Sequence, residues 1–303
     1  MTPLRIGTRR SPLALWQAHH VETLLRPLAA PRPVELVLIE TEGDRVRDRP
    51  LAQIGGDGLF TKEIQNALLD GRADVAVHSL KDLPTLVVPE LTLAAVPERG
   101  PVGDAFVSRR YARFDDLPPG ALVATSSLRR RSQLLHRRPD LRVESVRGNV
   151  ETRLRKLDET GLDAIILAEA GLRRLGLEEN ITEILARSWM LPAVGQGALG
   201  LECRSDDAET RRLLDPLNHP ATRAAVLAER EFLRRLGGGC LVPIGAHGEV
   251  DGDELRLTGA VLTGDGTRRI AGAARGPAAD PEAVGRDLAR QLREQGAGEL
   301  LER

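Results

Sequence analysis

The sequence contains few cysteines, few aromatic residues and only three lysines, Lys62, Lys81 and Lys156. Two cysteines cannot build a disulfide framework, so we expect a reducing, cytoplasmic location. Aromatic residues make up 2% of the chain and the formal net charge is -1, which argues against a base-stacking nucleic-acid surface. No apolar run approaches the ~20 residues that span a bilayer, and no signal-peptide core follows Met1. We therefore expect neither nucleic acid nor a membrane among the partners.

The sequence also lacks the spacings that typify metal sites and nucleotide-binding loops. Its six histidines show no ligand spacing and form no cluster with cysteine, so we predict no metal. The glycine-rich stretch 54–60 lacks the Gly-Lys-Ser/Thr ending of a P-loop. We interpret residues 51–63 instead as a mobile flap that covers a cleft.

Alternating strand-like and helix-like patterns predict two α/β lobes followed by a smaller α+β part with an antiparallel sheet. We predict three domains: residues 1–98 with 197–217, residues 99–196, and residues 218–303. The segment 197–203 is predicted to be a strand that rejoins the first sheet. The other predicted strands are 4–8, 34–41, 73–79, 91–96, 105–108, 121–125, 142–146, 163–168, 245–250, 254–262 and 268–274, and the principal predicted helices begin near residues 12, 61, 128, 149, 222 and 281.

Three predicted strand-to-helix turns, 8–11, 125–130 and 147–149, carry arginines, and the first two also carry hydroxyl groups. A helix N-terminus offers unpaired N–H groups and the positive end of its dipole, and arginine adds a planar fork of donors. Ordinary capping, with the arginines paired to surface acids, explains any one of these turns. Three of them at the carboxyl ends of strands, where open α/β sheets bind ligands, predict a ligand with several negative groups.

Asp82 lies in the segment 78–84, which follows a predicted buried strand and ends in a proline turn. Beside Lys81 and in an arginine-rich chain, this carboxylate should be ionised. It would repel a purely anionic ligand, so it suits a substrate whose reacting part becomes cationic. A structural salt bridge to a neighbouring arginine is the alternative, and the spacing does not separate the two.

Cys240 directly follows three glycines, residues 237–239. Because these glycines have no Cβ atoms, another surface can approach the backbone there. The thiol is therefore placed for reaction or covalent attachment, or else it is an idle loop thiol. Cys203 lies in an apolar stretch that is typical of a core cysteine.

Six stretches of the sequence carry a family resemblance: residues 8–15, 78–84, 125–130, 147–150, 191–197 and 238–245. They resemble stretches of the porphobilinogen deaminase (hydroxymethylbilane synthase) family and occur in the same order. The resemblance extends along essentially the whole chain. It implies two α/β lobes with mixed sheets, similar to type II periplasmic-binding-protein domains. It also implies a small α+β C-terminal domain that carries the cysteine. We accordingly expect a monomeric, cytoplasmic transferase of tetrapyrrole and haem biosynthesis.

The same resemblance implies a reaction and a set of residues. Four porphobilinogen units are deaminated and joined head to tail on a dipyrromethane cofactor, which Cys240 holds through a thioether, and water then releases hydroxymethylbilane. Asp82 is the implied catalytic carboxylate. The implied cofactor-binding residues are Lys81, Asp82, Thr125, Ser126, Ser127, Arg129, Arg130, Arg147, Gly148 and Arg153. The implied residues that bind porphobilinogen and the growing polypyrrole chain are Arg9, Ser11, Gln17, Phe60 on the flap, Arg147, Arg153 and Gln196.

The sequence departs from the family's pattern at several positions. Asp57 and Gln53 stand where members have lysines, and the turn 100–104 lacks a basic residue before its aspartate. Glu169 stands where a small or apolar residue is usual. Three other functions are weighed against the enzyme: a two-lobed anion-binding protein without catalysis, a nucleic-acid protein that uses the arginines, and a cysteine hydrolase with His247 as the base for Cys240.

Overall fold

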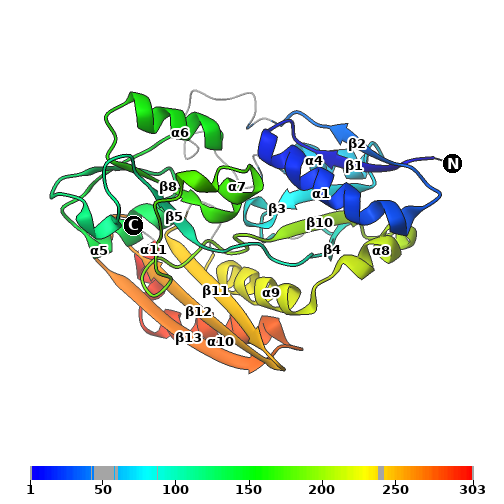
Figure 1. The fold of residues 1–303 in the computed structure, drawn as a ribbon. Coiled ribbons are helices and arrows are strands. Elements are labelled where there is room, and N and C mark those ends of the chain that lie inside the picture. The colour runs from blue at the N-terminus through cyan, green and yellow to red at the C-terminus, as the bar shows by residue number, and fades with distance from the viewer. Residues whose placement is uncertain are drawn as a thin grey trace. The chain divides into compact units, whose positions relative to one another are not determined.

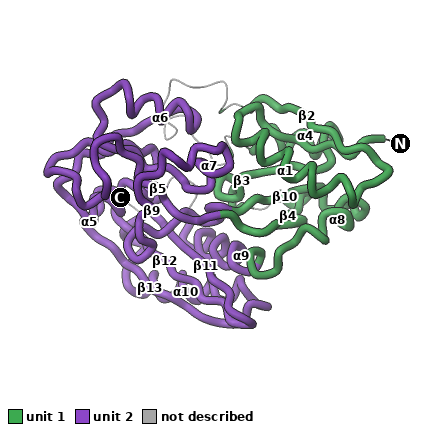
Figure 2. The backbone as a smooth tube through the Cα atoms, viewed as in Figure 1, with its two compact units in different colours: residues 1–100, 198–223 green, residues 101–197, 224–303 purple. Residues whose placement is uncertain are grey.

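The computed structural model describes residues 2–41, 43, 58, 61–86, 88–237 and 242–301. These residues form two compact units (Figure 2): unit 1 comprises residues 1–100 and 198–223, and unit 2 comprises residues 101–197 and 224–303. Cys240, Phe60, Asp57 and Gln53 lie outside the described residues, as does most of the predicted flap.

Unit 1 is built on a five-stranded mixed sheet with the order β2-β1-β3-β10-β4 (Figure 1). β1 pairs in parallel with β2 and β3, whereas β10 is antiparallel to β3 and β4. The strand predicted near 197–203 therefore does rejoin the first sheet, as β10. The elements are β1 (Leu4–Thr8), α1 (Pro12–Ala29), β2 (Val34–Leu38), α4 (Lys62–Leu69), β3 (Val75–Ser79), η1 (Leu80–Asp82), β4 (Leu91–Ala95), β10 (Leu199–Arg204), α8 (Ala208–Leu214) and η4 (Asp215–Leu217).

The first sheet of unit 2 also has five strands, in the order β7-β6-β8-β5-β9. β6 is parallel to β7 and β8, and β5 is antiparallel to β8. The antiparallel pairing brings the amino end of β5 to the edge of the sheet where β8 ends. The elements are β5 (Asp104–Val107), η2 (Phe114–Asp116), β6 (Leu122–Ala124), α5 (Leu128–Arg137), β7 (Arg142–Glu144), α6 (Val150–Glu159), β8 (Ala164–Ala168), α7 (Glu169–Arg174), η3 (Glu178–Asn180) and β9 (Glu183–Ile184).

The last part of the chain forms an antiparallel sheet, β11-β12-β13, with helices on its apolar face (Figure 1). Leu255 and Leu257 of the sheet share one core cluster with Phe232, Leu288 and Leu292 of the helices. The elements are α9 (Pro220–Arg235), β11 (Ile244–Asp251), β12 (Glu254–Leu262), β13 (Arg269–Pro277), α10 (Pro281–Glu294) and α11 (Ala297–Leu301).

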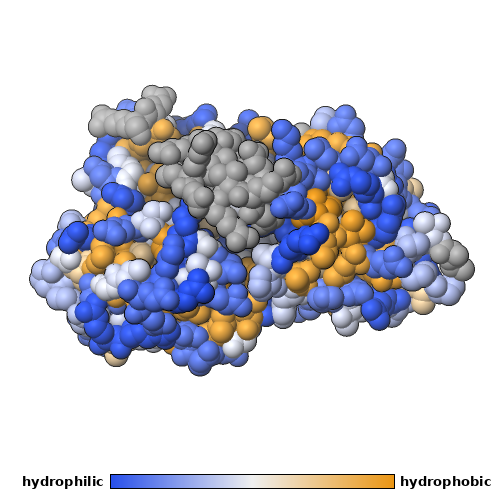
Figure 3. Space-filling model, turned by 90° about the horizontal axis from the view of Figure 1, so that it is seen from above, coloured by the Kyte–Doolittle hydropathy of each residue, from blue (hydrophilic) through white to orange (hydrophobic). Residues whose placement is uncertain are grey.

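The predicted fold class is confirmed by the two mixed α/β sheets and the small antiparallel sheet. A separate domain for residues 218–303 stays a prediction, since the described residues from 224 onward share unit 2 with residues 101–197. Among the described helices, none is both long and apolar enough to cross a membrane. On the face shown in Figure 3, hydrophobic patches are bordered by hydrophilic residues.

Candidate active site

In unit 1, predicted site residues gather where β1 and β3 end. The start of α1 is capped by Ser11, whose Oγ accepts the Ala14 N–H at 3.3 Å, and Pro12 is the first helical residue. One turn further on, Gln17 donates from Nε2 to Ser79 Oγ at 2.8 Å. Because β1 and β3 are parallel, this contact joins the first helix to the strand end that leads directly into Asp82.

Asp82 is a half-buried carboxylate at the end of the short helix η1. The backbone around it is fixed, since Leu80 N–H donates to Ala198 O at 3.0 Å and Leu83 N–H donates to Leu80 O at 3.2 Å. Within the described residues of unit 1, no side chain forms a hydrogen bond or ion pair with Asp82. The structural salt bridge weighed from the sequence is therefore not formed there, and the carboxylate is available to a ligand.

Behind this turn lies a buried polar cluster that the sequence reasoning missed. His78 Nε2 lies 3.1 Å from Glu202 Oε2, and both side chains are less than a tenth exposed. Gln65 Nε2 donates to the same carboxylate at 3.0 Å. No local sequence pattern predicts this cluster, because His78 and Glu202 are 124 residues apart in the chain. They meet only through the antiparallel pairing of β3 and β10.

In unit 2, the predicted hydroxyl residues form the N-terminal cap of α5. Ser127 Oγ accepts the Arg130 N–H at 3.4 Å, and Thr125 Oγ1 accepts the Ser127 N–H at 3.2 Å. No acceptor for either hydroxyl hydrogen lies among the described residues. Ser126 instead donates to Val146 O and pairs with Ser145 Oγ at 2.9 Å. Thr125 and Ser127 can therefore donate to an anion, whereas Ser126 is occupied by the neighbouring loop.

The start of α6 forms a second such turn. Asn149 caps the helix by accepting the Thr152 N–H at 2.9 Å. Gly148 has φ +116°, and a Cβ at this position would lie 2.5 Å from Thr152 Cγ2, so the turn requires glycine. Arg153 donates from Nε to Gly148 O at 2.8 Å. The buried Nη2 of Arg147 has no hydrogen-bond partner among the described residues.

Arg129 and Arg130 are buried against Asp104, the first residue of β5. Asp104 accepts from Arg129 Nη1 at 2.6 Å and from Arg130 Nε at 2.8 Å. Burial would raise the pKa of the Asp104 carboxyl, but the charges of the two arginines outweigh burial and hold that pKa well below its ordinary value. Gln196 donates to Asp104 Oδ1 at 3.1 Å and to Val102 O at 2.7 Å. The structure thus brings Arg129, Arg130 and Gln196 together around a carboxylate that sequence reasoning did not assign to the site.

Glu169, which the sequence left without explanation, begins α7. Its carboxylate lies at the positive end of that helix and accepts from Arg173 Nε at 2.8 Å, an ion pair one turn apart. A Cβ on Gly103 would lie 2.5 Å from Glu169 Oε2 and 2.8 Å from Ile184 Cγ2, so glycine leaves room there for both side chains. We therefore assign Glu169 to the structure of unit 2 and not to the site.

The remaining titratable candidates have other surroundings. His247, in β11, accepts at Nδ1 from Arg187 Nη1 at 3.0 Å. Cys203 is fully buried in β10, and burial raises the pKa of its thiol to about 11. Among the described residues, no group of histidine, cysteine and acidic side chains is arranged to hold a metal ion.

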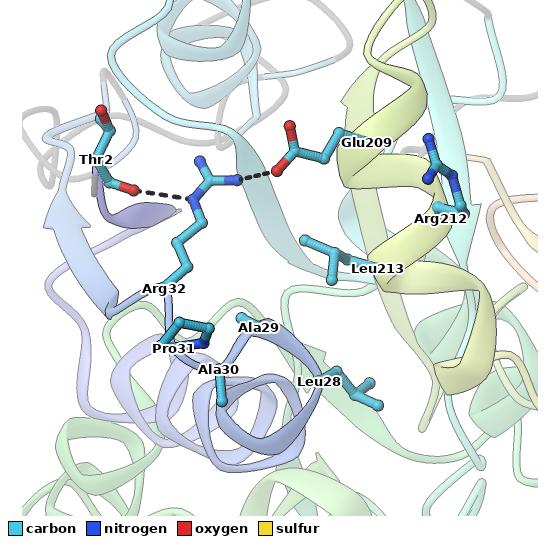
Figure 4. A pocket seen from close by; sticks show the side chains of 9 residues that line it. All are labelled: Thr2, Leu28, Ala29, Ala30, Pro31, Arg32, Glu209, Arg212 and Leu213. Atoms are coloured by element: carbon cyan, nitrogen blue, oxygen red, sulfur yellow. Dashed lines mark hydrogen bonds and ion pairs between the residues drawn. The ribbon is translucent and has the colours of Figure 1, made fainter.

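A cavity of about 600 Å³ lies elsewhere in unit 1, between the end of α1 and α8 (Figure 4). Arg32 reaches across it, with Nε donating to Thr2 O at 3.0 Å and Nη1 lying 3.2 Å from Glu209 Oε1. No predicted site residue lines this cavity, so it is separate from the candidate site.

The mixed sheets define an α/β protein whose strand ends in both units carry hydrogen-bond donors. Residues 4–212 match the family model "Porphobilinogen deaminase, dipyromethane cofactor binding domain", and residues 223–294 match "Porphobilinogen deaminase, C-terminal domain". The chain belongs to the porphobilinogen deaminase family, whose members serve tetrapyrrole biosynthesis, and its cofactor is dipyrromethane.

Solved structures with a similar course of the chain include two binding proteins. A periplasmic substrate-binding protein of an ABC transporter from Coxiella burnetii is 15% identical, with 74% of this chain and 94% of that chain covered and a TM-score of 0.46. A nutrient-binding protein from Burkholderia cenocepacia bound to methionine is 13% identical, with 77% and 95% covered and a TM-score of 0.44.

The described residues of unit 2 fit the chemistry of a dipyrromethane. The acetate and propionate side chains on its pyrroles present several carboxylates. The free hydroxyl hydrogens of Thr125 and Ser127 and the unpaired Nη2 of Arg147 are donors that carboxylates satisfy. Two helix N-termini, those of α5 and α6, add backbone N–H groups of the same polarity.

Proposed function

We propose that the chain is a transferase that deaminates porphobilinogen and joins four units head to tail on a dipyrromethane primer, which Cys240 holds through a thioether. The primer supplies the pyrrole carbon to which the first unit is added. Each addition forms one carbon–carbon bond and releases ammonia and the proton of the attacked pyrrole carbon. Water completes the cycle by releasing hydroxymethylbilane and leaving the primer in place.

The observation that carries this proposal is the half-buried carboxylate of Asp82, which has no side-chain partner among the described residues of unit 1. Loss of ammonia from the aminomethyl group leaves a cationic pyrrole. A carboxylate held by a fixed backbone stabilises that cation and accepts hydrogen bonds from pyrrole N–H groups. We therefore assign catalysis to Asp82, which acts on the part of the substrate that becomes positive.

The carboxylates of primer and substrate need a different set of side chains. In unit 2 we assign Thr125, Ser127, Arg147, Gly148 and Arg153 to them, on the donors described above. In unit 1 we assign Arg9, Ser11, Gln17 and Lys81, which lie at the strand ends around Asp82. The assignments of Phe60 and Cys240 rest on the family resemblance, because both residues lie outside the described part of the chain.

The test replaces Asp82 by Asn, which keeps the shape of the side chain and removes its charge. We expect kcat for porphobilinogen consumption to fall by about 10²- to 10⁴-fold, with an unchanged circular dichroism spectrum. The matched control is Asp70→Asn, an exposed aspartate at the end of α4 that pairs only with Arg72 among the described residues. Turnover of Asp82→Asn close to that of Asp70→Asn would contradict the assigned role.

The primer is tested independently by intact mass. We expect the purified wild-type protein to be heavier than its sequence by two pyrrole units, and we expect Cys240→Ser to have the mass of the sequence. A wild-type protein that binds porphobilinogen without releasing ammonia, and that carries no adduct, would favour the anion-binding protein without catalysis.

A further inference from the structure

We propose that Asp104 is a positioning residue for the carboxylate-binding end of α5. The inference rests on the proposed function, since it concerns how that function's carboxylates are held. Asp104 acts through Arg129 and Arg130 and has no contact with a ligand of its own. Its role is to hold the guanidinium groups of Arg129 and Arg130 in place, which fixes the geometry of the first turn of α5. The cluster of these three side chains then carries one net positive charge.

The charges are the first reason. One carboxylate faces two guanidinium groups, and all three side chains are buried, with exposed fractions of 1% for Asp104, 4% for Arg129 and 6% for Arg130. The cluster therefore has a formal charge of +1 at a helix end whose dipole is also positive. A buried excess charge is unfavourable unless a counter-charge compensates it. An anion bound at the cap of α5 supplies that counter-charge.

The hydrogen bonds are the second reason. Arg129 donates to Asp104 and, from Nη1, to Leu191 O at 2.5 Å. Arg130 donates to Asp104 and, from Nη1, to Ile166 O at 3.0 Å. Both arginines are thus held by β5, and further by the middle of β8 for Arg130 and by the loop that begins at Leu191 for Arg129. With both guanidinium groups fixed, the backbone of the first helical turn, which carries them, is fixed as well.

The orphaned donor atoms point to the ligand. Arg129 Nε is buried and has no hydrogen-bond partner among the described residues. The hydroxyl hydrogens of Thr125 and Ser127, at the same end of α5, have no acceptor there either. An unsatisfied buried donor such as Arg129 Nε is costly, so its presence beside an excess positive charge indicates a place for an anionic group. Asp104, Leu191 O and Ile166 O accept from the other guanidinium nitrogens, and Arg129 Nε is left without an acceptor among the described residues.

The test compares two variants of Asp104 with opposite consequences for charge and position. Asp104→Asn removes the negative charge in nearly the same shape, and Asp104→Glu keeps the charge but displaces it by one methylene group. If Asp104 only neutralised the arginines, Asp104→Asn would bind anions more tightly and its KM for porphobilinogen would fall. If Asp104 positions them, both variants bind carboxylates less well.

The readouts are the fraction of chains that carry the pyrrole adduct, measured by intact mass, and KM and kcat of the loaded chains. We expect both variants to load less primer or to raise KM by about tenfold or more, with a smaller change in kcat. The matched control is Asp74→Asn. Asp74 is also a buried carboxylate between two arginines, Arg5 and Arg32, but it precedes β3 and so lies at the opposite end of that strand from Asp82. We expect this control to lose stability while keeping wild-type loading and KM.

Three results would overturn the inference: wild-type loading and KM in Asp104→Asn, full rescue by Asp104→Glu, or failure of both variants to fold. The last would make Asp104 a folding residue. A wild-type protein with neither adduct nor turnover would instead refute the proposed function, which keeps the two failures distinct.

Discussion

The number and reactivity of thiols follow from the two cysteines and give a direct check on the covalent primer. If Cys240 is a thioether, Cys203 is the only free thiol of the loaded protein. Cys203 lies in β10, between β3 and β4, and is fully buried. We therefore expect no thiol to react quickly in the native loaded protein and one thiol per chain to react after unfolding.

Two routes of reaction set the expected slowing of Cys203. In the closed structure, burial raises the pKa of this thiol to about 11, so at pH 8 only about 0.1% is thiolate, roughly a hundredfold less than for an ordinary cysteine. The greater nucleophilicity of a more basic thiolate recovers about tenfold of that loss, but this route also needs access that full burial denies. Reaction through opening restores an ordinary pKa, and ~5 kcal/mol of opening free energy then slows the reaction by a factor of about 5,000.

The assay uses a chromogenic disulfide reagent at pH 8, with and without guanidinium chloride. Cys203→Ser should show no thiol in either state, and Cys240→Ser should still show the one slow thiol. Two thiols per chain on unfolding of the wild type would contradict the thioether. Rapid labelling of Cys203 in the native state, identified by peptide mapping, would refute the reasoning about burial.

Two further pairs of variants test the packing around α9 by urea unfolding. A Cβ on Gly285 would lie 2.5 Å from Ala228 O, whereas a Cβ on Gly298 meets nothing within 4 Å. We expect Gly285→Ala to lower the free energy of unfolding by about 1–3 kcal/mol and Gly298→Ala to leave it equal or raise it by up to ~1 kcal/mol; equal effects would contradict this packing. Glu229 is fully buried and accepts the Gly195 N–H at 2.7 Å and the Gly248 N–H at 2.8 Å, so Glu229→Ala should cost about 2–5 kcal/mol. The exposed pair of Glu254 with Arg275 makes Glu254→Ala the control, at about 1 kcal/mol or less, and a similar loss in both variants would refute the assignment.

Local signals predicted most of the helices and strands. The helix at 128–137 begins at the predicted residue because Ser127 caps it, and the strand at 254–262 has the predicted bounds because turns bracket it. The unpredicted helices and strands are short: α7 has six residues, α8 seven, α11 five and β9 two. Helix α7 begins directly after β8 without a loop, so the apolar pattern of the strand continues into the helix and hides the boundary.

The candidate site was predictable where its signal is local and not where it depends on pairing. The caps at Ser11, Ser127 and Asn149 are read from the residues beside them, and all three accept the expected backbone N–H groups. Local signals could not predict that Arg129 and Arg130 share Asp104 as a buried partner. Asp104 opens its strand, and in a parallel sheet the opening residues lie at the edge opposite the ligands.

The antiparallel direction of β5 reverses that expectation. Asp104 pairs with Ala168, the last residue of β8, so the first residue of one strand meets the last residue of the other. Since β6 and β8 are parallel, this is also the edge where α5 begins. Asp82 lies at the carboxyl end of β3 in unit 1, where no described side chain of that unit pairs with it. Two aspartates in an arginine-rich chain therefore differ by strand direction and surroundings: Asp104 is paired with arginines, and Asp82 is the one we propose for the substrate.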